Sequence, residues 1–268
     1  MRTAASSAPG AKAHGRERFV GGALGRGGET TPSFDQTPDK PKAFGFKVLW
    51  FAVKAADPTS VLDALEFGGA TPANWASGLA AAYGDRRSND AWAFASPAIS
   101  GWVLVVGLSL PHPTIETHHD IGKRFDVVFS RLMRRFDDVQ FFGSYRVCDF
   151  VAWARAVKGK PIRIFAYFGS EVLANVGNLS GLSPSDANDE MYRIAEKNSA
   201  ELDKLCVAGL SRREALKLVR QNGRSDFPGE TDVVDLAALW SIDPIQLGDQ
   251  DHPFSLGLAA RVPENLKQ

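Results

Sequence analysis

The sequence is short of cysteine, of net charge and of long apolar runs. Its two cysteines, Cys148 and Cys206, lie far apart, whereas a disulfide scaffold uses more of them at closer spacing, so both are read as free thiols. The 31 basic and 31 acidic side chains balance, which removes the simplest argument for nucleic-acid binding. No window reaches the ~18 apolar residues of a membrane span, and no apolar core of a signal peptide is present. These absences predict a soluble, cytoplasmic protein.

Motifs that identify the common catalytic chemistries are also missing. The chain has no Gly-x-Ser-x-Gly elbow, Walker motif, dinucleotide fingerprint, His-Glu-x-x-His or Cys-x-x-Cys spacing, so we predict no cofactor and no metal. Among the histidines only His118 and His119 are neighbours, and adjacent side chains diverge in direction, which makes poor metal co-ligands. The sequence therefore favours a protein without enzymatic activity. One alternative is a hydrolase or small-ligand enzyme with a site near His118, His119 and Asp120.

Composition divides the chain into three segments. Residues 1–43 are rich in Ala, Gly, Ser, Thr and Pro, and bury too little apolar surface to offset their ordering entropy, which predicts a disordered tail. Residues 44–250 carry the periodic apolar patterns of a single folded domain. Residues 251–268 have mixed polarity and are expected to lie along the surface or to fray.

The patterns within the domain mix strands and helices. Residues 44–53 and 103–106 are apolar on both faces, as central strands are. Between Phe125 and Phe136, apolar residues recur three and four positions apart, which predicts a helix with one buried face. The predicted fold class is α+β, with a mostly antiparallel β-sheet and helices packed largely on one of its faces.

The densest β signal lies in residues 139–168, where two long strands fold back at Lys158-Gly159-Lys160. The register decides which side chains share a face, because a slip of one residue moves every side chain across the sheet. A three-residue loop would place Arg155 opposite Arg163, whereas a two-residue turn would place Arg155 opposite Ile162. We favour the three-residue loop because it divides apolar and polar side chains more cleanly.

That register gathers aromatic and arginine side chains on one face of the hairpin, which we call the aromatic–arginine face. Its members are Trp153, Arg155, Arg163, Phe165 and Tyr167. Since Trp, Tyr and Arg supply interface hot spots, the face could bind a partner protein. Alternatively, a helix or the N-terminal strand covers the face and the arginines pair within the chain, for example with Asp149 or Glu171.

Several short stretches resemble a group of uncharacterised bacterial α+β proteins. The stretches are Gly101–Gly107, Phe142–Val147, Trp153–Ala156, Ala166–Gly169, Phe227-Pro228 and Leu239–Pro244. The resemblance spans residues 90–247 and carries no catalytic motif. Proteins of this kind are often immunity or interaction proteins of toxin systems, so the resemblance implies an immunity-protein-like role by association with the fold.

The leading functional hypothesis is a non-enzymatic protein-binding protein, such as an immunity protein that neutralises a toxin through the aromatic–arginine face. Its partner would be a protein, with no membrane and no nucleic acid involved. A nucleic-acid-associated regulator is a further alternative, which would use Arg131, Arg134 and Arg135 at the end of the predicted helix. The acidic pair Asp137-Asp138 beside them is typical instead of an ordinary solvated face.

Overall fold

The computed structural model describes residues 33–84, 91–114, 119–169, 171–177, 197–198, 200–221 and 228–267. The chain divides into two units, residues 1–32 and residues 33–268, and all described residues belong to the second. Most of the predicted tail therefore lies outside the described residues.

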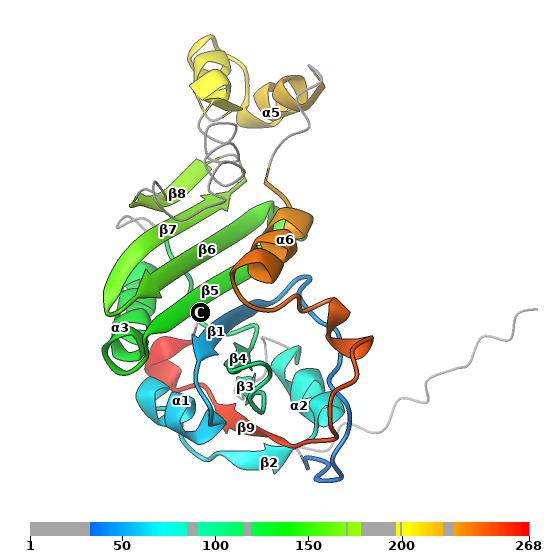
Figure 1. The fold of residues 1–268 in the computed structure, drawn as a ribbon. Coiled ribbons are helices and arrows are strands. Elements are labelled where there is room, and N and C mark those ends of the chain that lie inside the picture. Colours follow the sequence, from blue (N-terminus) through cyan, green and yellow to red (C-terminus); the bar gives the residue numbers. More distant parts are fainter. Residues whose placement is uncertain are drawn as a thin grey trace, which may run out of the picture. The chain divides into compact units, whose positions relative to one another are not determined.

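The described chain contains one sheet of nine strands, in which every neighbouring pair is antiparallel (Figure 1). The strands are β1 (Leu49–Lys54), β2 (Thr71–Ala73), β3 (Trp92–Ala95), β4 (Trp102–Val106), β5 (Asp138–Tyr145), β6 (Phe150–Val157), β7 (Lys160–Phe168), β8 (Glu171–Val176) and β9 (Gly257–Arg261). Their spatial order is β2-β9-β3-β4-β1-β5-β6-β7-β8. The predicted α+β class with an antiparallel sheet is confirmed.

Helices cover both faces of this sheet, whereas the prediction placed them largely on one face. The helices are α1 (Pro58–Leu65), α2 (Trp75–Ala82), α3 (His119–Arg135), α5 (Arg212–Gln221) and α6 (Glu230–Trp240). Helices α1 and α3 share one apolar core with the sheet, the α1/α3 layer, and helices α2 and α6 share the other, the α2/α6 layer. Strand β4 is buried along its whole length, so the sheet has two apolar faces and each needs a cover.

Residues 33–43 belong to the folded domain, although their composition assigned them to the tail. Phe34 packs edge-on against Trp92, with ring centroids 5.0 Å apart. The carboxylate of Asp39 accepts the first two backbone N–H groups of α2 at 2.7 and 3.1 Å. These contacts, together with hydrogen bonds to Asn74 and Ser255, anchor this segment, and such contacts leave no apolar pattern in the sequence.

Of the C-terminal segment, residues 251–267 are described, and they are neither frayed nor confined to the surface, which corrects the prediction for them. Strand β9 lies between β2 and β3, and its Ala259 and Ala260 are fully buried. A Cβ atom at Gly257 would lie 2.4 Å from the carbonyl oxygen of Ala95, so the strand approaches its neighbour closely. Glycine and alanine are depleted in strands, which explains why the pattern did not predict this one.

The hairpin of β6 and β7 combines a two-residue turn with the register expected for a three-residue loop. Val157 pairs with Lys160 across the turn, and both turn residues have positive φ, 50° at Lys158 and 74° at Gly159. A β-bulge next to Arg155 then shifts the register, so that Arg155 opposes Arg163. The predicted loop length is wrong, while the predicted pairing is confirmed.

Candidate binding site

The aromatic–arginine face is buried within the α2/α6 layer. Trp153, Phe165 and Tyr167 have no exposed surface, and Arg163 is 2% exposed. Trp153 stacks on Phe165 with ring centroids 4.4 Å apart. This arrangement agrees with the covered-face interpretation, and a partner could reach these side chains only by displacing what covers them.

The two opposed arginines bind to different groups within the chain. Arg155 donates hydrogen bonds to both carboxylate oxygens of Asp138, at 3.2 and 2.7 Å, and lies over the ring of Trp240. Arg163 donates to the side-chain oxygen of Asn175 at 2.5 Å and to a β8 carbonyl at 3.2 Å. The Asp138 carboxylate neutralises Arg155 and so reduces the repulsion expected between the arginines, whereas Asn175 binds Arg163 through an uncharged oxygen. The sequence had indicated neither partner.

The alternative enzymatic site largely falls outside the described side chains. His118 is not among the described residues, and His119 and Asp120 begin α3 without a described side chain. His112 donates a hydrogen bond to the carbonyl of Pro113 and packs on the ring of Phe150. Within the described ranges no group of three His, Cys, Asp or Glu side chains suits a metal ion.

The basic end of α3 is partly structural. Arg131 forms an ion pair of 2.7 Å with Glu66 and so ties α3 to the end of α1, while Arg134 and Arg135 are exposed. None of the described helices is both long and apolar enough to span a membrane.

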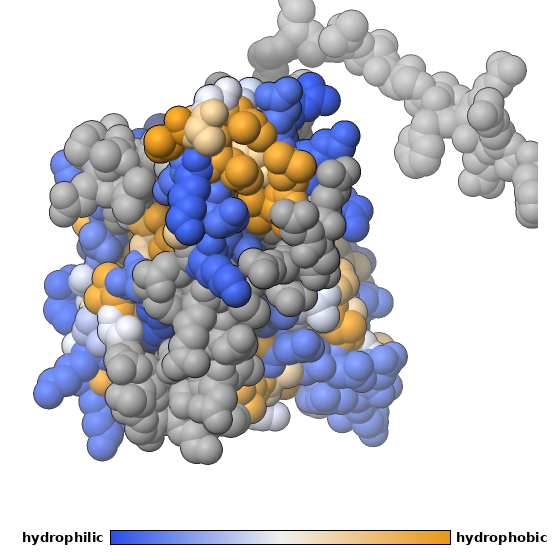
Figure 2. Space-filling model, turned by 90° about the horizontal axis from the view of Figure 1, so that it is seen from above, coloured by the Kyte–Doolittle hydropathy of each residue, from blue (hydrophilic) through white to orange (hydrophobic). Residues whose placement is uncertain are grey.

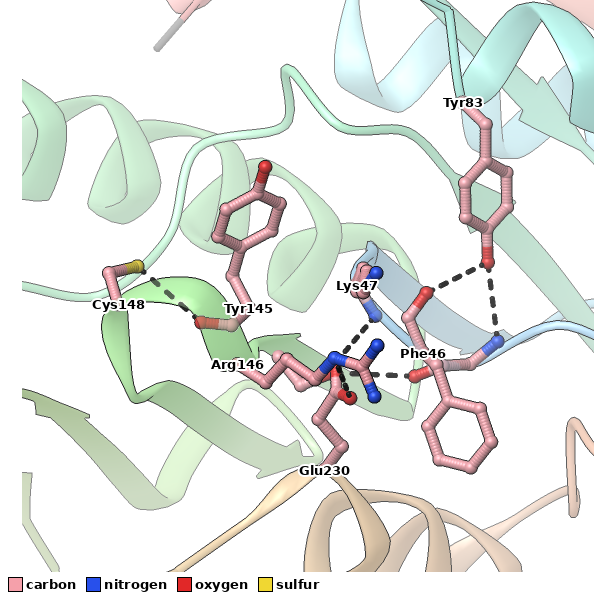
Figure 3. A network of polar contacts seen from close by, with 9 residues as sticks. Phe46, Lys47, Tyr83, Tyr145, Arg146, Cys148 and Glu230 are labelled. Atoms are coloured by element: carbon pink, nitrogen blue, oxygen red, sulfur yellow. Dashed lines mark hydrogen bonds and ion pairs between the residues drawn. The ribbon is translucent and has the colours of Figure 1, made fainter.

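A nearly buried carboxylate organises the end of the sheet where β1 begins and β5 ends (Figure 3). Glu230, the first residue of α6, accepts the Lys47 backbone N–H at 2.8 Å and the Ser144 hydroxyl at 3.2 Å, and its side chain is 12% exposed. Arg146 approaches the other carboxylate oxygen at 4.0 Å. This arrangement, which we call the Glu230 clamp, joins three segments that are distant in the sequence.

Tyr83, at the end of α2, holds the turn formed by residues 45–47, which precedes β1 and includes Lys47 (Figure 3). Its hydroxyl accepts the Gly45 N–H at 3.5 Å and donates to the Phe46 carbonyl at 3.3 Å. Burial raises the pKa of the Tyr83 hydroxyl; the bond from Gly45 opposes this rise, and the negative charge of Glu230 adds to it. The hydroxyl thus keeps its proton at neutral pH and remains a donor.

The turn that these bonds hold has an uncommon backbone. Gly45 has a φ of 123° and Lys47 a φ of 55°, and the left-handed conformation costs a residue with a Cβ roughly 1–2 kcal/mol. The bonds to Glu230 and Tyr83 offset this cost. Figure 3 shows the Phe46 ring turned away from the bonded backbone, and Phe46 is 46% exposed. The turn therefore presents Phe46 to solvent in a fixed geometry.

The exposed side chains around the Glu230 clamp form an aromatic and basic area that we call the clamp surface. Its members are Phe46, Lys47, Tyr83, Arg146 and Val147. Val147 is 75% exposed and the Arg146 side chain 68% exposed. Aromatic and arginine side chains are enriched at protein interfaces. Ser144 is fully buried and hydrogen-bonded to Glu230, so the geometry supports binding better than nucleophilic chemistry.

Sequence reasoning did not find the clamp surface. Glu230 stands in the first turn of a helix, where acidic residues are common because they suit the helix dipole, so it carried no functional signal. The positive φ of Lys47 is likewise invisible in the sequence. The nearest signal was Gly45 within the stretch 44–53, since glycine supplies unusual backbone angles.

Comparison with known proteins provides no relative: no protein-family model, no curated protein and no solved structure matches this chain.

Replacing Glu230 with alanine is expected to lower the free energy of unfolding by about 2–3 kcal/mol, because a buried hydroxyl and a backbone N–H lose a charged acceptor. Hydrogen exchange at the Lys47 amide should accelerate at least about tenfold. Asp235→Ala, at an exposed position of the same helix, is the matched control. Equal stability and equal Lys47 exchange in the two variants would show that the clamp does not hold the turn.

Proposed function

We propose that this chain is a non-enzymatic protein-binding protein, for example an immunity protein that neutralises a toxin. Its partner docks on the clamp surface. The observation that carries the proposal is the gathering of exposed Phe46, Arg146 and Val147 around a turn fixed by Glu230. The proposal thus keeps the function expected from the sequence and moves its site from the aromatic–arginine face to the clamp surface.

A fixed turn favours binding because little conformational entropy remains to be lost when a partner docks. Hydrogen bonds from Glu230 and Tyr83 hold the backbone on either side of Phe46. Hot spots are typically aromatic or arginine side chains surrounded by contacts that exclude water. Phe46 and Arg146 supply the two residue types, and the exposed Val147 follows Arg146 in the chain.

The charge of the clamp surface indicates an acidic partner. Lys47 and Arg146 are exposed, whereas the carboxylate of Glu230 is withdrawn beneath them. A surface whose exposed charges are positive attracts a negatively charged partner and accelerates its association at low salt.

The double substitution Phe46→Ala, Arg146→Ala is expected to weaken partner binding at least about tenfold while leaving unfolding unchanged, because both side chains are exposed. Tagged full-length protein would be incubated with a lysate of its native host, and retained proteins compared by quantitative mass spectrometry. Retained candidates would then be purified and their dissociation constants measured.

Phe254→Ala is the matched control, since Phe254 is 65% exposed and lies outside the clamp surface. At least one protein should be retained by the wild type and by this control and lost from the double variant. If the double variant retains every protein that the control retains, the clamp surface is not the binding site.

A further inference from the structure

A helical hairpin stands apart from both sheet layers and has a small core of its own (Figure 1). Helical residues 200–207 pack against α5 through Leu202, Ala215 and Val219, and these three side chains belong to neither sheet core. Gly209 turns the chain with a φ of 97°. We call residues 200–221 the helical hairpin.

The start of α5 is firmly capped. The Ser211 backbone N–H donates to the Glu214 carboxylate at 3.1 Å, and the Glu214 N–H donates to the Ser211 hydroxyl at 3.3 Å. The hydrogen bonds from Ser211 lower the pKa of Glu214, so this carboxylate stays charged and is engaged in the cap. The cap makes α5 a defined element that a partner can recognise.

The hairpin leaves large apolar side chains in solvent. Val207 is 90% exposed and Leu218 is 39% exposed. Partly buried apolar side chains of the hairpin are Leu205, Cys206, Leu210 and Leu216. Figure 2, which views the molecule from above Figure 1, shows hydrophobic residues at the surface next to hydrophilic ones. An apolar patch with a polar rim is typical of an interaction site.

Besides the capping carboxylate of Glu214, helix α5 carries the exposed cations Arg213 and Lys217. Arg213 and Lys217 lie one helical turn apart, and neither forms an ion pair in the part of the chain that the structure describes. Like charges four residues apart destabilise a helix, and two carboxylates spaced one turn apart on a partner would relieve this repulsion.

We propose that the helical hairpin binds an acidic amphipathic helix of a partner protein, whose apolar face covers Val207 or Leu218 and whose carboxylates pair with Arg213 and Lys217. Recognition of an amphipathic helix by apolar anchors is a recurring binding mode. Nucleic acid would use the cations without the apolar side chains, and a second copy of the basic hairpin would be repelled. This site is separate from the clamp surface, so its failure leaves the proposed function untouched.

The probe is a displayed library of random peptides of about 16 residues, roughly four helical turns, selected on the full-length protein. We expect enrichment of peptides with carboxylates one turn apart and apolar residues at helical spacing. The strongest peptide would be synthesised, and its affinity measured by fluorescence anisotropy against the wild type and three variants.

Two double variants are compared with the wild type: one carries Arg213→Glu and Lys217→Glu, the other Val207→Ser and Leu218→Ser. Each should lower the affinity for that peptide at least about tenfold, whereas Phe46→Ala should leave the affinity unchanged. Circular dichroism would verify that each variant is folded. The proposal is overturned if no acidic amphipathic peptide is enriched, or if the peptide binds both double variants as it binds the wild type. It is also overturned if a DNA duplex binds more tightly than the peptide and depends on the two cations alone.

Discussion

Replacing Trp153 with alanine is expected to lower the free energy of unfolding by about 3–5 kcal/mol, because the side chain is fully buried and the cavity cannot fill. Trp153 stacks on Phe165 and lies opposite Phe142 of β5, so its loss removes packing on two neighbouring strands. Chemical denaturation followed by far-ultraviolet circular dichroism measures the change without relying on tryptophan emission.

The matched comparison is Phe254→Ala, which removes an aromatic ring that is 65% exposed. Substitutions at such positions usually change stability by less than about 0.5 kcal/mol. If Trp153→Ala were as stable as Phe254→Ala, Trp153 would have to lie on the surface, and the covered-face interpretation would be wrong.

Introducing a carboxylate into β9 is expected to prevent folding or to lower the free energy of unfolding by several kcal/mol. Ala260 is fully buried among the apolar side chains of the α1/α3 layer. Burying an unpaired charge is among the most destabilising single changes. The variant Ala260→Asp should therefore accumulate as insoluble protein or unfold at a much lower denaturant concentration than the wild type.

Asn265→Asp adds the same charge only five positions further along the chain, at an exposed site, and should unfold like the wild type. Soluble yield and the midpoint of denaturation measure both variants. Equal behaviour of the two would mean that residues 251–268 lie on the surface, as their composition had indicated, and that β9 is not part of the sheet.

Elements with strong apolar periodicity were predictable from the sequence. The stripe from Phe125 to Phe136 predicted α3, which spans His119–Arg135, and the dense β signal predicted β6 and β7. The pairing of Arg155 with Arg163 was also predicted. The predicted turn was one residue longer than the observed turn, and the β-bulge next to Arg155 compensates for this difference. A local sequence pattern predicts a helix or strand correctly where buried side chains recur at regular spacing along that element.

Features that depend on distant residues were not predictable. Strand β9 consists of small residues that become a strand only because β2 and β3 lie on either side. The Glu230 clamp joins the turn before β1, the end of β5 and the start of α6. The sequence left open whether the aromatic–arginine face is covered, and the structure covers it because helices pack on both faces of the sheet.

The most direct test of the proposed function is hydrogen exchange of the chain alone and in complex with the partner that depends on Phe46 and Arg146. If the partner docks on the clamp surface, protection on binding should concentrate in residues 44–48 and 145–148 and leave the strands of the aromatic–arginine face unchanged. Protection confined to residues 150–168 would instead place the partner on the aromatic–arginine face and contradict this account.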